Sequence, residues 1–276
     1  MTSIIRSAAV IGSLFVYGAA CTRPTSTTTI TVPWIGTSTA SSTIVPCTGP
    51  ATVVIETPFA TETATCPPAP TAQPAPCETL PDCSADGLDI DYYANPVGYY
   101  GTGNVSPSYY ISQGLSPLDS SLTNTTFFPQ DSVPDSGPDG WTRVVNGGIS
   151  VNGFNFTLVY SGFYRAPRTG VFTICSSADN ENAIFFGRGN AFSCDTGKPS
   201  ADAQPLVISR GESRVNPINC TDVYLVQDRY YPVRNVMGNY GASSAFNFTI
   251  WEPNVPWEAR THDFPGNVYP SSCGWF

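Results

Sequence analysis

Histidine is almost absent from this sequence, and closely spaced cysteine pairs are lacking. The one histidine is His262, and no Cys-x-x-Cys pair occurs among the nine cysteines. Structural zinc sites draw on cysteine and histidine ligands at short spacings, and a Ser-His-Asp triad needs a histidine within its site. The composition therefore argues against a zinc protein and against a serine hydrolase.

Basic residues are also scarce, because 12 Lys and Arg stand against 21 Asp and Glu, for a net charge of −9. Nucleic acids and anionic membrane surfaces are bound by basic patches, and no basic cluster occurs here. We expect no nucleic-acid partner and no membrane insertion. Twenty-one acids always offer carboxylate pairs, but no stretch resembles a glycosidase site, so we expect a protein that is not an enzyme.

No convincing amphipathic helix interrupts the strand signals that dominate from Gly87 onwards. The chain of 276 residues contains 24 Gly and 26 Pro and is 41% hydrophobic, which favours many short strands joined by turns. Phe156 and Leu158 alternate with Asn155 and Thr157, a pattern that predicts a half-buried strand with the last two side chains facing solvent. The fold class we predict is all-β, an antiparallel β-sandwich.

Three regions differ in composition. Residues 1–20 combine a basic start, a short apolar run and small residues at the end, which predicts a secretory signal peptide too short to span a membrane. Residues 21–82 are rich in Thr, Ser and Pro, and we interpret them as a disordered or extended stalk. Residues 83–276 form the predicted sandwich domain, within which residues 99–138 read as an irregular excursion.

The predicted secretion bears on the nine cysteines and on the N-glycosylation motifs of the chain. Cysteines in a secreted chain are expected to form disulfides, and Asn-x-Ser/Thr motifs permit N-glycosylation. The five acceptors are Asn104, Asn124, Asn155, Asn219 and Asn247.

Four oxygen-bearing side chains follow one another at residues 179–182, between apolar runs at 171–175 and 183–186. The pattern predicts two strands with these four residues at the tip of the loop between them. Crowded oxygen ligands suit a hard cation such as Ca²⁺. Asx residues also favour turns without binding anything, and spacing alone leaves that alternative open.

Three stretches, in this order along the chain, resemble the GLEYA and flocculin adhesin domains of fungi. These domains are variants of the β-sandwich of anthrax protective antigen, and the resemblance covers roughly residues 83–273. Residues 27–58 are similar to a single flocculin-type repeat. The three stretches are residues 87–93, Asp179-Asn180 with 183–187 and 191–194, and residues 230–250.

The resemblance implies a lectin-like domain in which a cis-linked acidic pair binds calcium and the ion accepts two sugar hydroxyls. Asp179 and Asn180 match the pair, Asn239 matches an amide ligand in a second loop, and carbonyls near Tyr240 and Gly241 would complete the ion's shell. Tyr240 and Ser243 match positions that vary with the sugar. In this architecture the termini come together, which implies a disulfide between Cys83 and Cys273 and leaves the other cysteines unassigned.

Asn180 departs from the family, which has a second aspartate at this position, and calcium affinity depends on the charge of the ligands. Two functions therefore follow from the resemblance. One is a secreted adhesin domain, extracellular or associated with the cell wall, that binds cell-surface or host glycans through calcium. The alternative is a structural wall glycoprotein that keeps the fold but has lost calcium and sugar binding.

Overall fold

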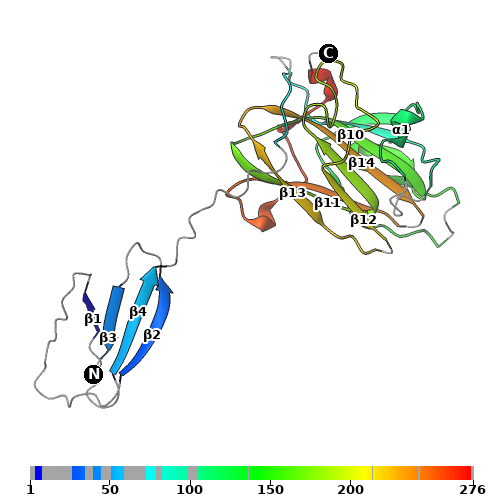
Figure 1. Cartoon of the computed structure of the whole chain (residues 1–276). Coiled ribbons are helices and arrows are strands. Elements are labelled where there is room, and N and C mark those ends of the chain that lie inside the picture. The colour runs from blue at the N-terminus through cyan, green and yellow to red at the C-terminus, as the bar shows by residue number, and fades with distance from the viewer. Residues whose placement is uncertain are drawn as a thin grey trace, which may run out of the picture. The chain divides into compact units, whose positions relative to one another are not determined.

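The structure is a computed structural model, and the chain divides into two compact units, Met1–Ala69 and Pro70–Phe276 (Figure 1). Each unit is described by itself. The residues that the structure describes are 4–7, 27–34, 40–44, 51–58, 73–78, 83–98, 105–135, 137, 139–212, 214–241 and 243–274.

The first unit holds a four-stranded sheet in the order β1-β3-β4-β2. Strands β2 and β4 are parallel, whereas β3 pairs antiparallel with both β1 and β4. Threonine, valine and isoleucine, which favour extended backbone, supply much of β2 and β4. The segment expected to be a stalk thus contains regular strands, as the flocculin-like repeat allowed. The bounds are β1 Ile4–Ser7, β2 Thr27–Trp34, β3 Ala40–Ile44 and β4 Ala51–Pro58.

The described residues of the second unit form almost wholly antiparallel strands, with one short helix and three 3₁₀ turns among them. The excursion expected over residues 99–138 contributes α1, β6 and β7. The elements are β5 Leu88–Tyr93, α1 Tyr109–Ser112, β6 Asp119–Thr123, β7 Phe127–Phe128, β8 Thr142–Val144, η1 Asn146–Gly148, β9 Ser150–Asn152, β10 Asn155–Arg165, β11 Gly170–Phe186, β12 Val207–Gly211, β13 Asn219–Leu225, β14 Tyr230–Tyr240, β15 Ala245–Trp251, η2 Trp257–Ala259, β16 Val268–Tyr269 and η3 Ser271–Cys273.

Strand β11 belongs to both layers of the predicted sandwich (Figure 1). Its first part pairs with β13 and β15, and β7 extends that layer beyond β15. Its last part pairs with β12 and β14, and β10, β5 and β6 extend the second layer. The strand passes from one layer to the other at Asp179 and Asn180. The all-β antiparallel sandwich is confirmed.

Aromatic residues fill both faces of the layer that contains β10 and β14. One cluster lies between the layers and includes Phe156, Phe172 and Phe246. A second cluster, with Tyr109 of α1, covers the opposite face. Thr157 is therefore fully buried, with the Tyr109 hydroxyl 2.9 Å from its Oγ1. The expectation that Thr157 faces solvent was wrong, because the pattern of one strand does not reveal a second covering layer.

Three disulfides tie the second unit together. Cys83 joins Cys273, the pairing that the resemblance implied, and Cys175 joins Cys220 across β11 and β13. The third joins Cys77 to Cys194, and the Cys77 amide donates to the Tyr230 carbonyl at 2.9 Å. Residues 73–78 therefore pack on the sandwich, and the boundary expected between residues 82 and 83 does not coincide with the boundary between the two units.

Candidate functional site

Asp179 and Asn180 lie inside strand β11 rather than at a loop tip. Their side chains are 2% and 6% exposed, and the peptide bond between them is cis. The predicted loop was wrong because strands on both sides supply the backbone partners: Asp179 is paired with Ala245 of β15, and Asn180 with Gly211 of β12. The cis bond is the one that the resemblance implied.

Only two of the four polar side chains at residues 179–182 meet each other. The Asn180 Nδ2 donates to Asp179 Oδ1 at 3.0 Å. Glu181 instead pairs with Arg210 at 2.6 Å, and Asn182 donates to Asn235 at 2.8 Å. The expected cluster of four adjacent oxygen ligands is therefore wrong, because an extended strand separates these residues along its length and Glu181 and Asn182 have partners of their own on β12 and β14.

The end of strand β14 lies directly beside this pair. The Tyr240 amide donates to Asn180 Oδ1 at 2.7 Å, and the Gly241 amide donates to the Phe154 carbonyl at 2.9 Å. Asn239 is fully buried, and its Nδ2 donates to the Gly153 carbonyl at 3.2 Å. Its Oδ1 is buried and has no hydrogen-bond partner among the described residues. An unsatisfied buried acceptor is costly, so this oxygen has the capacity to bind a further ligand or a water molecule, as do the seven other buried side-chain atoms without a partner among the described residues.

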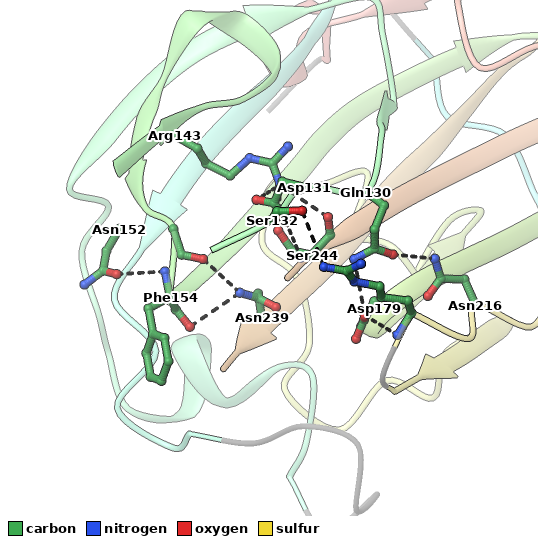
Figure 2. Close-up of polar contacts among 12 residues, drawn as sticks. Gln130, Asp131, Ser132, Arg143, Asn152, Phe154, Asp179, Asn216, Asn239 and Ser244 are labelled. Carbon is green, nitrogen blue, oxygen red and sulfur yellow. Dashed lines mark hydrogen bonds and ion pairs between the residues drawn. The ribbon is translucent and has the colours of Figure 1, made fainter. Parts of the chain in front are cut away.

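Figure 2 shows how the Asp179 carboxylate is held. Its Oδ2 accepts from the Arg214 backbone amide at 3.1 Å and faces the Gln130 Nε2 at 3.4 Å. Gln130 in turn accepts from Asn216 at 3.0 Å. These contacts fix the carboxylate between segments that are far apart in the sequence.

Tyr240 and Ser243 occupy the surface side of the same region. Tyr240 is 41% exposed, and its ring meets Phe154 edge to face at 5.6 Å between centroids. Ser243 and Gly241 are partly exposed. Asn180 of β11 and Tyr240 of β14 are thus in contact, with the Asp179–Asn180 pair buried and the tyrosine ring accessible.

The charge of the site comes from Asp179 alone. No group of three or more His, Cys, Asp or Glu side chains gathers anywhere in the described parts of the chain. Glu181 is 1% exposed, and burial raises the pKa of its carboxyl while Arg210 opposes that rise. The donors that suit a hard cation are therefore one carboxylate and two amide oxygens, which fit calcium in kind and are poor in charge.

The comparisons with known proteins agree with this arrangement. Residues 156–252, which include both halves of the site, match the family model of the GLEYA domain. This part of the chain is similar to the GLEYA domain. A search of curated proteins found no match.

Solved structures of yeast adhesins share this fold. A subtype-switched Epithelial Adhesin 9 A domain from Candida glabrata, in complex with β-lactose, is 22% identical and gives a TM-score of 0.58 over 73% of this chain and 94% of its own. The Epithelial Adhesin 9 A domain with Galβ1-4GlcNAc is 24% identical, with a TM-score of 0.56 over 72% and 95%. Epithelial Adhesin 6, with Galβ1-3GlcNAc, is 22% identical at a TM-score of 0.57 over 72% and 93%. The structures that the fold resembles are adhesin domains and not enzymes.

Sequence reasoning missed one group of residues beside the candidate site. Arg143 of β8 donates to Asp131 Oδ2 at 2.6 Å and to Ser244 Oγ at 2.7 Å, and the Ser244 amide donates to Asp131 Oδ1 at 2.6 Å. Asp131 and Arg143 carry no sequence signal of this role, because both lie outside the stretches that resemble the family.

The predicted glycosylation sites differ in accessibility within the second unit. Asn219 is exposed, whereas Asn124, Asn155 and Asn247 are partly buried, and Asn104 lies outside the described residues. The Asn155 Nδ2 donates to the Asn95 carbonyl at 2.9 Å. Glycosylation stays a prediction at all five positions.

Proposed function

We propose that this chain carries a GLEYA-type adhesin module that binds carbohydrate through a calcium ion. One observation carries the proposal: Asn180 of β11 contacts both Asp179 Oδ1 and the Tyr240 amide, and Tyr240 follows Asn239, whose buried Oδ1 has no hydrogen-bond partner among the described residues. The fold shared with yeast adhesin domains supports it.

Asp179 would supply the one charged ligand, and Asn180 and Asn239 would supply amide oxygens. Carbonyls near Tyr240 and Gly241 would complete the set, as the family resemblance implies. Calcium, when bound, supplies a positive centre that can accept sugar hydroxyls as further ligands. The protein's own part is to hold these oxygens rigidly, through the Arg214, Gln130 and Tyr240 contacts described above.

Tyr240 and Ser243 would face the bound sugar. Tyr240 offers an exposed ring that can pack on the apolar face of a pyranose. The matched adhesin structures were solved with β-lactose, Galβ1-4GlcNAc and Galβ1-3GlcNAc. A β-galactosyl disaccharide is therefore the first ligand to test, and glycans of other cells or of a host are the proposed partners.

The proposed location is the cell surface or wall, reached by secretion. Disulfides of the kind present here form in oxidising compartments, which supports this location. Among the described residues, no helix has the length and apolarity needed to cross a membrane.

Binding of β-lactose by the full chain, with calcium and with EDTA, tests the proposal. We expect binding only with calcium and none in Asp179→Ala. Asp222→Ala is the matched control, since Asp222 is an exposed carboxylate on β13 that accepts from Thr173 away from the site. Equal binding of β-galactosyl sugars in EDTA, or by Asp179→Ala, would contradict calcium-dependent recognition.

A second candidate function, a structural wall glycoprotein without the ion, has one observation in its favour. Both oxygens of the Asp179 carboxylate already accept hydrogen bonds from protein donors, one of them from Asn180. A buried carboxylate satisfied in this way is stable without a cation. Calcium-independent unfolding of the wild-type chain would favour this candidate.

A further inference from the structure

One segment outside the proposed ligands contacts both halves of the site. Gln130 lies against Asp179 Oδ2 at 3.4 Å, and the next residue, Asp131, accepts from the Ser244 amide at 2.6 Å. Asp179 sits on β11, whereas Ser244 ends the short connection between β14 and β15. The segment therefore spans the two places from which the proposed ligands come (Figure 2).

Asp131, Arg143 and Ser244 form a closed group, named here the Asp131 brace. The Arg143 guanidinium donates to the Asp131 carboxylate and to both the hydroxyl and the carbonyl of Ser244, at 2.6, 2.7 and 3.3 Å. The Asp131 amide donates back to the Ser244 carbonyl at 3.3 Å. Arg143 also stacks 4.5 Å above the centroid of Phe128.

The brace is shielded from water, so its contacts are stronger than those of a surface pair. The side chains of Arg143 and Asp131 are 12% and 16% exposed, and Ser244 is fully buried. Exposed ion pairs contribute little, whereas charge-assisted hydrogen bonds in a shielded setting fix geometry. The three residues thus hold one backbone position, that of Ser244, with high precision.

The β14 end of the connection is held as well. The Tyr240 amide donates to Asn180 Oδ1, and the Gly241 amide donates to the Phe154 carbonyl. Ser243, which was predicted to take part in ligand binding, therefore lies between Gly241 and Ser244, two residues whose backbone amides are held by hydrogen bonds. At the Ser244 end the holding residues, Asp131 and Arg143, are not among the predicted ligands.

We propose that the Asp131 brace positions Ser243 and Ser244 relative to Asp179, and thereby sets the affinity of the site for calcium. This inference rests on the proposed function, but it assigns Asp131 and Arg143 a part that the family resemblance does not give them. They are positioning residues, since no atom of either reaches the proposed ligands.

The physical reason is that ligand oxygens bind an ion well only when their mutual distances are fixed beforehand. Residues that orient metal ligands typically change metal affinity by about 10- to 100-fold when they are mutated. Without the brace, the connection must be ordered at the moment of binding, which costs conformational entropy. The same loss would follow from either partner of the Asp131–Arg143 pair, because each holds the other.

Calcium titration calorimetry of the full chain and a set of matched variants tests this. Asp131→Asn keeps the size and one acceptor but loses the charge, and Arg143→Met keeps the packing on Phe128 but loses the donors. We expect each to weaken calcium binding by about tenfold. The double variant should be no weaker than either single one, because the two residues act as a unit.

Two further proteins separate positioning from general stability. Arg143→Lys keeps a charged donor and should recover part of the affinity. Asp228→Asn breaks an exposed pair with Arg165, 2.5 Å apart and far more solvent-accessible, and should leave calcium binding unchanged. Unfolding temperatures measured in EDTA show the effect of each change on the fold alone.

The outcomes distinguish this inference from the proposed function. Weaker calcium binding in Asp131→Asn and Arg143→Met, with partial recovery in Arg143→Lys, supports the brace. Brace variants that melt earlier in EDTA but bind calcium as tightly as the wild type would overturn it and leave the proposed function standing. A wild type that binds no calcium overturns the proposed function itself.

Discussion

Asn180→Asp restores the acidic pair of the resembled family and should have opposite effects with and without calcium. The wild-type Nδ2 donates to Asp179 Oδ1 at 3.0 Å, and the substitution places a second carboxylate oxygen at that position. The Tyr240 amide still has an acceptor, because either carboxylate oxygen can take its hydrogen bond. The change therefore alters charge while preserving shape.

The cost without calcium follows from the separation of the two charges. Two unit charges about 4 Å apart interact by about 4 kcal/mol at an effective dielectric constant of about 20. The pair can take up a proton, which removes the repulsion and so limits this cost. Each unit by which the pKa of the carboxyl pair rises corresponds to about 1.4 kcal/mol. We expect the free energy of unfolding in EDTA to fall by about 2–4 kcal/mol near neutral pH.

With calcium, the added charge should tighten ion binding and reverse the loss. A ligand that binds only the folded state stabilises it in proportion to the logarithm of its concentration over Kd. Thermal unfolding in EDTA and in a calcium series therefore gives a larger calcium-induced rise in Tm for Asn180→Asp than for the wild type. A loss of stability that is the same in EDTA and in calcium would refute the reasoning.

Asn182→Asp is the matched control for this experiment. Asn182 lies two residues further along β11, is fully buried and donates to both Ser176 and Asn235 at 2.8 Å. A carboxylate there also replaces a donor in a buried site, but away from the proposed ligands. Its destabilisation should be independent of calcium.

Three further predictions concern the frame around the site. Replacing Cys83 and Cys273 with serine opens a bridge with a sequence separation of 190, and chemical denaturation should show a loss of about 4–5 kcal/mol; an unchanged midpoint would contradict this. Glu181→Gln should remove a pH dependence: because the folded pKa is raised above 4.5, wild-type stability falls as pH rises from 4.5 through the folded value, and the melting temperature of the variant should lack that slope. A chain beginning at Pro70 should melt cooperatively, whereas one beginning at Cys83 leaves Cys194 without its partner and should melt at a lower temperature; equal temperatures would place the boundary later.

The sequence predicted the layered all-β fold, because alternation and turns are local properties of the chain. It did not predict that β11 runs unbroken through Asp179 and Asn180. Asx residues favour turns in isolation, but here two neighbouring strands satisfy the backbone on both sides of the layer change. Tertiary pairing outweighed local preference.

The site likewise contains residues that the sequence identified and residues that it did not. Asp179, Asn180 and Asn239 were identified through the family resemblance. The structure joins Asn180 to Asp179 and to the amide of Tyr240, the residue after Asn239. Asp131 and Arg143 were not identified, because their role depends on a contact with Ser244 across about a hundred residues of chain, separations of 113 and 101. Contacts of this kind leave no periodic or local signal in one sequence.

Calorimetric titration of the wild-type chain with calcium tests the central claim most directly. The claim predicts a single saturable binding event that disappears in Asp179→Ala and persists in Asp222→Ala, followed by β-lactose binding only after calcium is added. The absence of binding heat in the wild type, together with sugar binding that EDTA does not affect, would contradict it.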